Sequence, residues 1–201
     1  MNTELEKIFS FPSILVGADT GPWVNRYEAK LDMRVATSLS SDYNIAYERV
    51  KFWFHDVMHS AVLIHQEDPK LQTWRDTGMS CLDFPQNPVD QIVGLMLMSK
   101  LTAITEGRLE ILRVGITSPG DDHVTYFCDR EDHLHWFEEP GWWRDPRPIY
   151  CTQPRRSRGH GKVISINRDA DWKDHDLDWP GADNNVGNVS VLPVRAPDAP
   201  E

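Results

Sequence analysis

The longest apolar passage of the chain, residues 87–117, carries its own start and stop signals. Asn87 is a favourable N-cap, Pro88 suits the first helical position, and Asp90 places a carboxylate where the helix dipole favours one. Apolar residues then cover most of a helix circumference up to the Glu106-Gly107 pair, which ends the helix. The pattern predicts a helix buried on more than one side.

Shorter segments alternate between apolar and polar positions, which is typical of strands with one buried face. Residues 30–35 show the alternation most clearly, and residues 109–116 follow the buried helix with side chains that suit a pleated surface. In chain order, the expected strands are residues 14–16, 30–35, 109–116 and, after a turn at 118–122, 123–128. Residues 2–9 are expected to form a short N-terminal helix, and residues 70–86 a polar connection.

A second long helix is predicted from residue 43 to residue 65, with an apolar stripe facing the core. The opposite side carries Phe52 and Leu63 beside His55 and His59 instead of a fully charged surface. A second partly apolar face indicates a second contact, either with another subunit or with the helix that begins near residue 89.

The composition changes after residue 129, where tryptophans and prolines crowd into an aromatic wrap that includes Trp142 and Trp143. A basic patch at residues 155–162, an acidic run and a Gly-, Asn- and Pro-rich end follow. These patterns predict one α+β domain over residues 1–150, with a small antiparallel sheet and two long helices packed on one face. Residues 151–201 are expected to form an extended tail that a protein partner or subunit holds.

The negative net charge limits the classes of partner that the chain is expected to bind. With 201 residues and a formal charge of −10, the chain argues against a general nucleic-acid binder, because binding to phosphate backbones depends on Lys and Arg. An interaction of the 155–162 patch with RNA is the exception that the sequence leaves open. No apolar run reaches the length of a membrane span and no secretory signal is present, so a cytoplasmic protein is expected. The three cysteines lack disulfide or zinc-ligand spacing.

Taken together, residues 14–128 give two strands, two helices and two strands. This order resembles the tunnelling fold of pterin and deazapurine enzymes, whose subunits assemble side by side into barrels with the helices outside. The resemblance implies zinc bound by a His-x-His pair with a further His, or a Cys/Lys/His set, and a glutamate that anchors a purine-like ring at a subunit interface. His133 and His135 have the spacing but follow the last expected core strand, and Glu106 is the positional candidate for the anchor. No catalytic residue of that family is assigned to a position of this chain.

Three groups of residues could carry chemistry. His55 and His59 lie one helical turn apart, a spacing that can hold a metal, although a third ligand is missing. His133 and His135 lie among acidic residues and form the other candidate metal site. Lys100 interrupts an apolar face and is a candidate base or nucleophile, or a lysine paired with Glu48 or Glu106.

Two hypotheses follow from these observations. The first is a self-associating cytoplasmic assembly protein without catalytic activity or cofactor, acidic and tryptophan-rich in the manner of a virus-encoded accessory protein. Its interface would include Phe52, Leu63, Trp142 and Trp143, with His55 and His59. The alternative is a tunnelling-fold-type enzyme acting on a purine- or pterin-like small molecule, with zinc as its cofactor and with Lys100 and Glu106 as candidate catalytic residues.

Overall fold

The computed structural model describes residues 3–17, 21–121, 123–129, 132, 135–148, 155–156, 163–164 and 171–180. Its centre is a six-stranded mixed sheet in the order β4-β3-β1-β2-β5-β6, flanked by helices, so the α+β class predicted from the sequence is confirmed. The sheet is not purely antiparallel as expected, because β3 pairs in parallel with both β1 and β4. The strands are β1 (Glu4–Gly17), β2 (Gly21–Val35), β3 (Val62–His65), β4 (Cys81–Phe84), β5 (Leu109–Thr117) and β6 (Thr125–Asp129), with a separate pair β7 (Arg155–Arg156) and β8 (Val163–Ile164).

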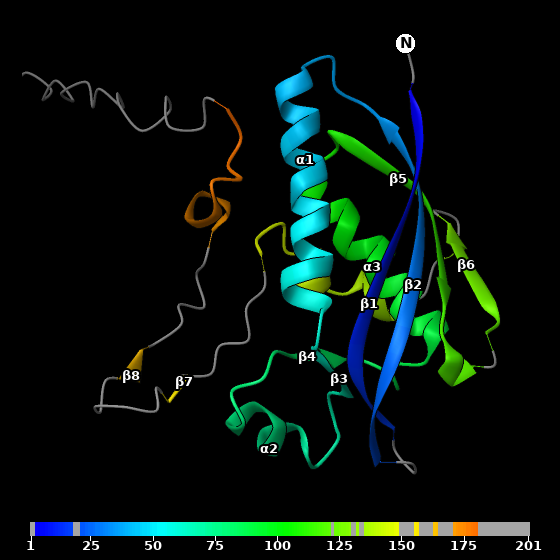
Figure 1. Ribbon diagram of the computed structural model, residues 1–201, viewed down its shortest axis with the longest axis vertical. Helices are drawn as coiled ribbons and strands as arrows, with labels where there is room; N and C mark the ends of the chain where they lie inside the picture. The colour runs from blue at the N-terminus through cyan, green and yellow to red at the C-terminus, as the bar shows by residue number, and fades with distance from the viewer. Residues whose placement is uncertain are drawn as a thin grey trace, which may run out of the picture.

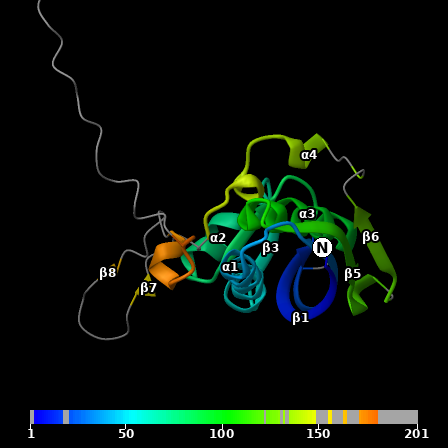
Figure 2. The same ribbon diagram turned by 90° about the horizontal axis from the view of Figure 1, so that it is seen from above.

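Two long helices cover one face of this sheet. The helix α1 (Ser40–Phe52) packs against α3 (Asp90–Thr105), and α3 packs against β5 and β6 (Figures 1 and 2). Buried side chains from both helices and from alternate positions of β1, β2 and β5 form one hydrophobic core. Shorter elements are α2 (Leu71–Asp76), α4 (His135–Glu138), the π-helical turn η1 (Trp53–Met58) and the 3-10 turns η2 (Pro119–Asp121), η3 (Trp142–Arg144) and η4 (Trp172–His175).

The predicted N-terminal helix is wrong, because residues from Glu4 onward form the first half of the long hairpin between β1 and β2. Phe9 and Phe11 are buried on one face of β1, while Ile8 and Ser10, which alternate with them, point to the other face and are exposed. This period of two suits a strand and not a helix. The partner strand β2 supplies hydrogen bonds along the whole length, which no local signal reveals.

The second long helix is shorter than predicted. It ends in η1, and Ser60 has a left-handed backbone (φ 65°), which stops further helix. Ser60 N donates to Pro12 O, and the Ser13 hydroxyl donates to Met58 O at 2.8 Å, so β1 fixes this end. The rest of the expected helix becomes β3. The polar connection at 70–86 likewise contains α2 and β4.

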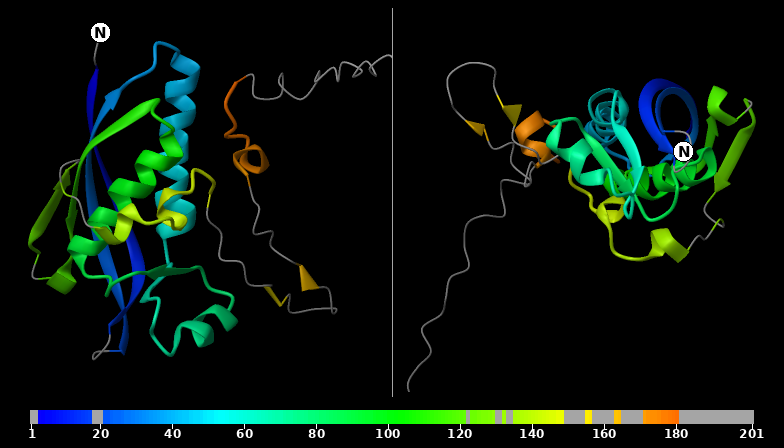
Figure 3. Two further views of the ribbon diagram at one scale, coloured as in Figure 1. Left: turned by 180° about the vertical axis from the view of Figure 1, so that it is seen from behind. Right: turned by 90° about the horizontal axis from the view of Figure 1, so that it is seen from below.

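The buried helix is confirmed as α3, with Val89 as the residue that caps it instead of Asn87. None of the helices in the described ranges has both the length and the hydropathy needed to cross a bilayer. The segment around η4 lies beside α1, on the side away from the β1–β2 hairpin (Figure 3). The predicted domain boundary at residue 150 stays a prediction, but η4 is in contact with the α+β body through Trp172.

Candidate binding site

Glu106 lies at the end of α3, in a turn that aims its carboxylate at α1. Its backbone is left-handed (φ 46°, ψ 39°), and Gly107 follows with φ 76°. A left-handed conformation costs a residue with a Cβ about 1 kcal/mol, so it persists only where surrounding contacts hold it. The main contact is an ion pair in which the guanidinium of Arg49 donates to Glu106 Oε1 at 2.7 Å. A strained residue with a fixed carboxylate is typical of a functional site.

Arg49 is a cation almost fully enclosed by the protein, with 1% of its surface exposed. Its Nε donates to Leu177 O at 2.9 Å, and Nη1 donates to Ile104 O at 3.1 Å as well as to Glu106. Burial lowers the pKa of Arg49, and Glu106 opposes this shift. Because the ordinary value is so high, the guanidinium stays charged at neutral pH. The site therefore contains a permanent buried positive charge.

The indole of Trp179 lies directly against this pair. Its Nε1 donates to Glu106 Oε1 at 2.9 Å, and the guanidinium carbons of Arg49 and Arg108 lie 3.8 and 3.9 Å from its ring centroid. Arginine over an indole face is an attractive cation–π contact. One flat bicyclic ring is thus held by a carboxylate at its N–H edge and by two cations over its face.

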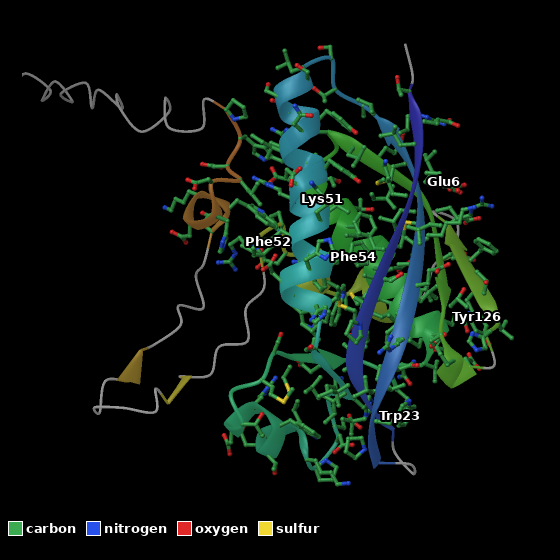
Figure 4. The ribbon with its side chains drawn as sticks, in the orientation of Figure 1. Glu6, Trp23, Lys51, Phe52, Phe54 and Tyr126 are labelled. Carbon is green, nitrogen blue, oxygen red and sulfur yellow. The ribbon has the colours of Figure 1, made fainter. Side chains whose placement is uncertain are left out.

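Trp172 forms a second, deeper contact of the same segment. It is 2% exposed, donates from Nε1 to Pro146 O at 2.6 Å, and lies edge-on to Phe52 and 4.7 Å from the Arg49 guanidinium carbon. The turn η4 that carries it is closed by a capping box between Asp171 and Asp174. Figure 4 shows Phe52 on the side of α1 that faces η4, with Phe54 nearer the hairpin. Trp172 anchors the segment to the body of the protein.

Lys100, a candidate catalytic residue, is fully buried in the structure and holds a loop. Its Nζ donates to the carbonyl oxygens of Trp142, Asp145 and Arg147 at 3.2, 2.6 and 2.9 Å. Burial lowers its pKa to about 7, and Asp145 opposes this shift. Three carbonyls match the three donors of an ammonium, so the side chain acts as a staple for residues 142–147. The expected pairing with Glu48 or Glu106 is not what the structure shows, since these bind Lys51 and Arg49.

The structure describes one of the two predicted histidine sites, that of His55 and His59. His55 and His59 are exposed on and after η1, and His59 Nδ1 lies 3.1 Å from the Ser60 hydroxyl. Within the residues that the structure describes, no group of three or more His, Cys, Asp or Glu could hold a metal. His133 and the side chain of His135 lie outside those residues, so their predicted zinc site stays a prediction.

The predicted interface residues occupy different depths. Leu63 is fully buried in β3, so it contributes to the core and not to an exposed helix face. Trp143 is also buried, and Trp142 is half-buried with its Nε1 donating to Asp83 O at 2.8 Å. The sequence alone does not show how deeply these two tryptophans lie, because the contacts of Lys100 with residues 142–147 form only in the tertiary structure. Phe52 packs against Trp172 within the same chain.

A separate hollow of about 390 Å³ lies between α3, the end of β6 and α4. Apolar side chains such as Leu95 and Phe137 line it together with the carboxylates of Asp129, Asp132 and Glu138. Among the described residues that line it, the cation is Arg144, which donates from Nε to Phe137 O at 2.7 Å. The described lining of this hollow mixes apolar and acidic side chains, whereas the Glu106 site brings a carboxylate, two arginines and an indole N–H together.

A buried polar network was also missed by sequence reasoning. Ser118 donates to Asp90 Oδ1 at 2.9 Å and accepts from Asn25 Nδ2 at 2.8 Å. Asp90 Oδ2 and the Tyr27 hydroxyl are buried there without a hydrogen-bond partner among the described residues. Burial raises the pKa of Asp90, and the Ser118 bond opposes it. From the sequence alone, Asp90 has only a favourable position in the helix dipole, because its contact with Ser118 spans 28 residues.

Neither a family model nor a curated protein matches this sequence. The structure is similar to that of an uncharacterized protein from Wolinella succinogenes (TM-score 0.48, 10% identity, 65% of this chain and 99% of the other). It is also similar to the 6-pyruvoyl tetrahydropterin synthases of Caenorhabditis elegans (TM-score 0.40, 10% identity, 64% and 96%) and Plasmodium vivax (TM-score 0.41, 11% identity, 65% and 98%). The likeness concerns the fold alone, and it is the likeness that the order of elements predicted.

Proposed function

We propose that this chain is a tunnelling-fold-type protein that binds a purine- or pterin-like small molecule with the ring against Glu106. One observation carries the proposal. Glu106 Oε1 accepts a hydrogen bond from the indole N–H of Trp179 at 2.9 Å, and the guanidinium carbons of two arginines lie within 3.9 Å of the centroid of that flat bicyclic ring. Purines and pterins share with indole a fused planar ring and an N–H at its edge.

The charges of the site favour such a ligand over an aliphatic one. A carboxylate selects for an N–H donor, and a guanidinium selects for a polarisable face. The Glu106 side chain is 36% exposed, so it is reachable from solvent, whereas Arg49 is enclosed and keeps the carboxylate in place. The proposed role of Glu106, Arg49 and Arg108 is to bind the ring of the ligand.

The test is a titration of pterin, followed by its fluorescence, and of guanine, followed by calorimetry, into the intact protein and into Glu106→Gln. We expect the variant to bind at least roughly tenfold more weakly, because an amide is a weaker acceptor than a carboxylate. Glu48→Gln is the matched control, since Glu48 pairs with Lys51 on the exposed side of α1. Equal binding by the intact protein and Glu106→Gln, or no binding of either ring, would contradict the proposal.

Self-association is the second candidate function, and the end of the sheet supports it. The strand β6 is the last in the sheet order, and Phe127 on it and Val124 just before it are 53% and 48% exposed. An edge strand with exposed apolar residues can pair with another copy. We propose a homo-oligomer formed through this edge. Light scattering would show its mass, and Phe127→Lys should shift that mass to the monomer; a monomeric intact protein would rule the candidate out.

A further inference from the structure

The segment that carries Trp179 is attached to the protein at two levels of depth. Trp172 is buried, its indole N–H is bonded to Pro146 O, and the turn around it has its own capping box. Trp179 is only half-buried and its indole N–H is bonded to an exposed carboxylate. One end of the segment is therefore an anchor, and the other lies over a site at the surface.

The backbone between the two tryptophans is fixed up to Leu177. Leu177 N donates to Trp172 O at 2.9 Å, and Leu177 O accepts from Arg49 Nε. Beyond it, Asp178 Oδ1 accepts from the backbone N–H of Trp179, a contact that moves with the tryptophan itself. Rotation at residues 178–179 would thus take Trp179 off Glu106 while Trp172 keeps its bond to Pro146 O and Leu177 O keeps its bond to Arg49 Nε.

We propose that Trp179 is an internal occupant of the Glu106 site, which an incoming flat ring with an N–H donor displaces while Trp172 holds the segment to the protein. The inference rests on the proposed function for the class of ligand. The indole and the ligand use the same carboxylate oxygen and the same arginines, so they exclude each other. Apparent affinity for the ligand is then reduced by the fraction of molecules in which Trp179 is bound in the site.

Comparing the intact full-length protein with Trp179→Ala tests this directly. We expect Trp179→Ala to bind pterin at least about fivefold more tightly, because the competitor is gone. Trp179→Phe keeps a ring over the arginines but has no N–H, so its affinity should fall between the two. Trp23→Ala is the control, because this half-buried tryptophan lies on β2 near the far end of the sheet (Figure 4). Equal or weaker pterin binding by Trp179→Ala than by the intact protein would overturn the inference.

A second probe separates this inference from the proposed function. Free indole should bind to Trp179→Ala and not to the intact protein, as seen by ligand-observed NMR, with circular dichroism showing that the variant is folded. Indole binding without pterin or guanine binding would support the occupied site and sink the proposed ring class. Equal pterin binding by both proteins would leave the proposed function standing and remove the occupant. Binding of neither probe to the folded variant would reject both.

Discussion

Glu106 Oε1 accepts hydrogen bonds both from the guanidinium of Arg49, at 2.7 Å, and from the indole of Trp179, 73 residues further along the chain, at 2.9 Å. One carboxylate oxygen therefore connects α1, the end of α3 and the segment after η4. A buried cation, a partly exposed anion and an aromatic N–H meet at a single acceptor. This arrangement makes stability and the proposed ligand binding depend on the same few atoms.

Replacing Arg49 with Met should lower the free energy of unfolding by about 3 kcal/mol. The change removes the hydrogen bonds that Arg49 donates to the Glu106 carboxylate and to two backbone carbonyls, and it removes the Arg49 cation from both tryptophan rings. Urea unfolding followed by tryptophan fluorescence measures the loss. Arg26→Met, at an exposed position of β2, is the control and should change stability little. A loss below about 1 kcal/mol for Arg49→Met would mean that the buried cation is not what holds this cluster.

Lys100→Met should be destabilising by about 2 to 4 kcal/mol, because three part-buried carbonyls lose their common donor. The loop that Lys100 holds also supplies Pro146 O to Trp172, so we expect residues 142–147 and the η4 segment to loosen together. Hydrogen exchange and thermal unfolding would show both effects. Lys51→Met, on the exposed side of α1, serves as the comparison. If only global stability fell while exchange in the η4 segment stayed the same, the link between loop and segment would be refuted.

The pH dependence of stability should report on Asp90. Burial raises the pKa of this carboxyl above its ordinary value, so the folded chain holds the proton more tightly than the unfolded chain. The contribution is fully present below the unfolded pKa and is lost as pH rises through the folded pKa. Asp90→Asn should abolish that loss and raise stability at pH 7 by about 1 kcal/mol, since an amide is neutral throughout. Denaturation at several pH values checks this, with the exposed Asp56→Asn as control. An unchanged pH profile for Asp90→Asn would contradict it.

Gly94 permits the close packing of α3 on the sheet. A Cβ there would lie 2.9 Å from Cys128 Sγ and 3.0 Å from Ile116 Cγ2, so one of them must move. Gly94→Ala should therefore cost about 1 to 2 kcal/mol in spite of the better helix propensity of alanine. In a chain that already carries Cys128→Ala, adding Gly94→Ala should lower the free energy of unfolding much less than it does in the intact protein. Failure of the cysteine change to restore stability would show that the clash is with the sheet backbone or Ile116.

The sequence by itself determined the elements whose apolar period is strong. The helix over residues 90–105, the strands near 109–116 and 123–128, and the α+β order of elements follow from spacing within a few residues, whereas the predicted strand 30–35 covers only the second part of β2. Glu106 could be singled out as well, because it ends the helix at a definite place in that order. These features depend on neighbours close in sequence, and such patterns are visible without coordinates.

Only the tertiary structure decided what depends on contacts between distant residues. The strand β1 was expected as a helix at its start, because its alternation gains meaning only when β2 pairs with it; the second helix ends early because β1 fixes Ser60. Arg49 and Trp179 gave no local signal, since their partners lie 57 and 73 residues away. A buried charge is stable only where folding supplies its counter-charge and carbonyls, so the site exists only once the chain is folded.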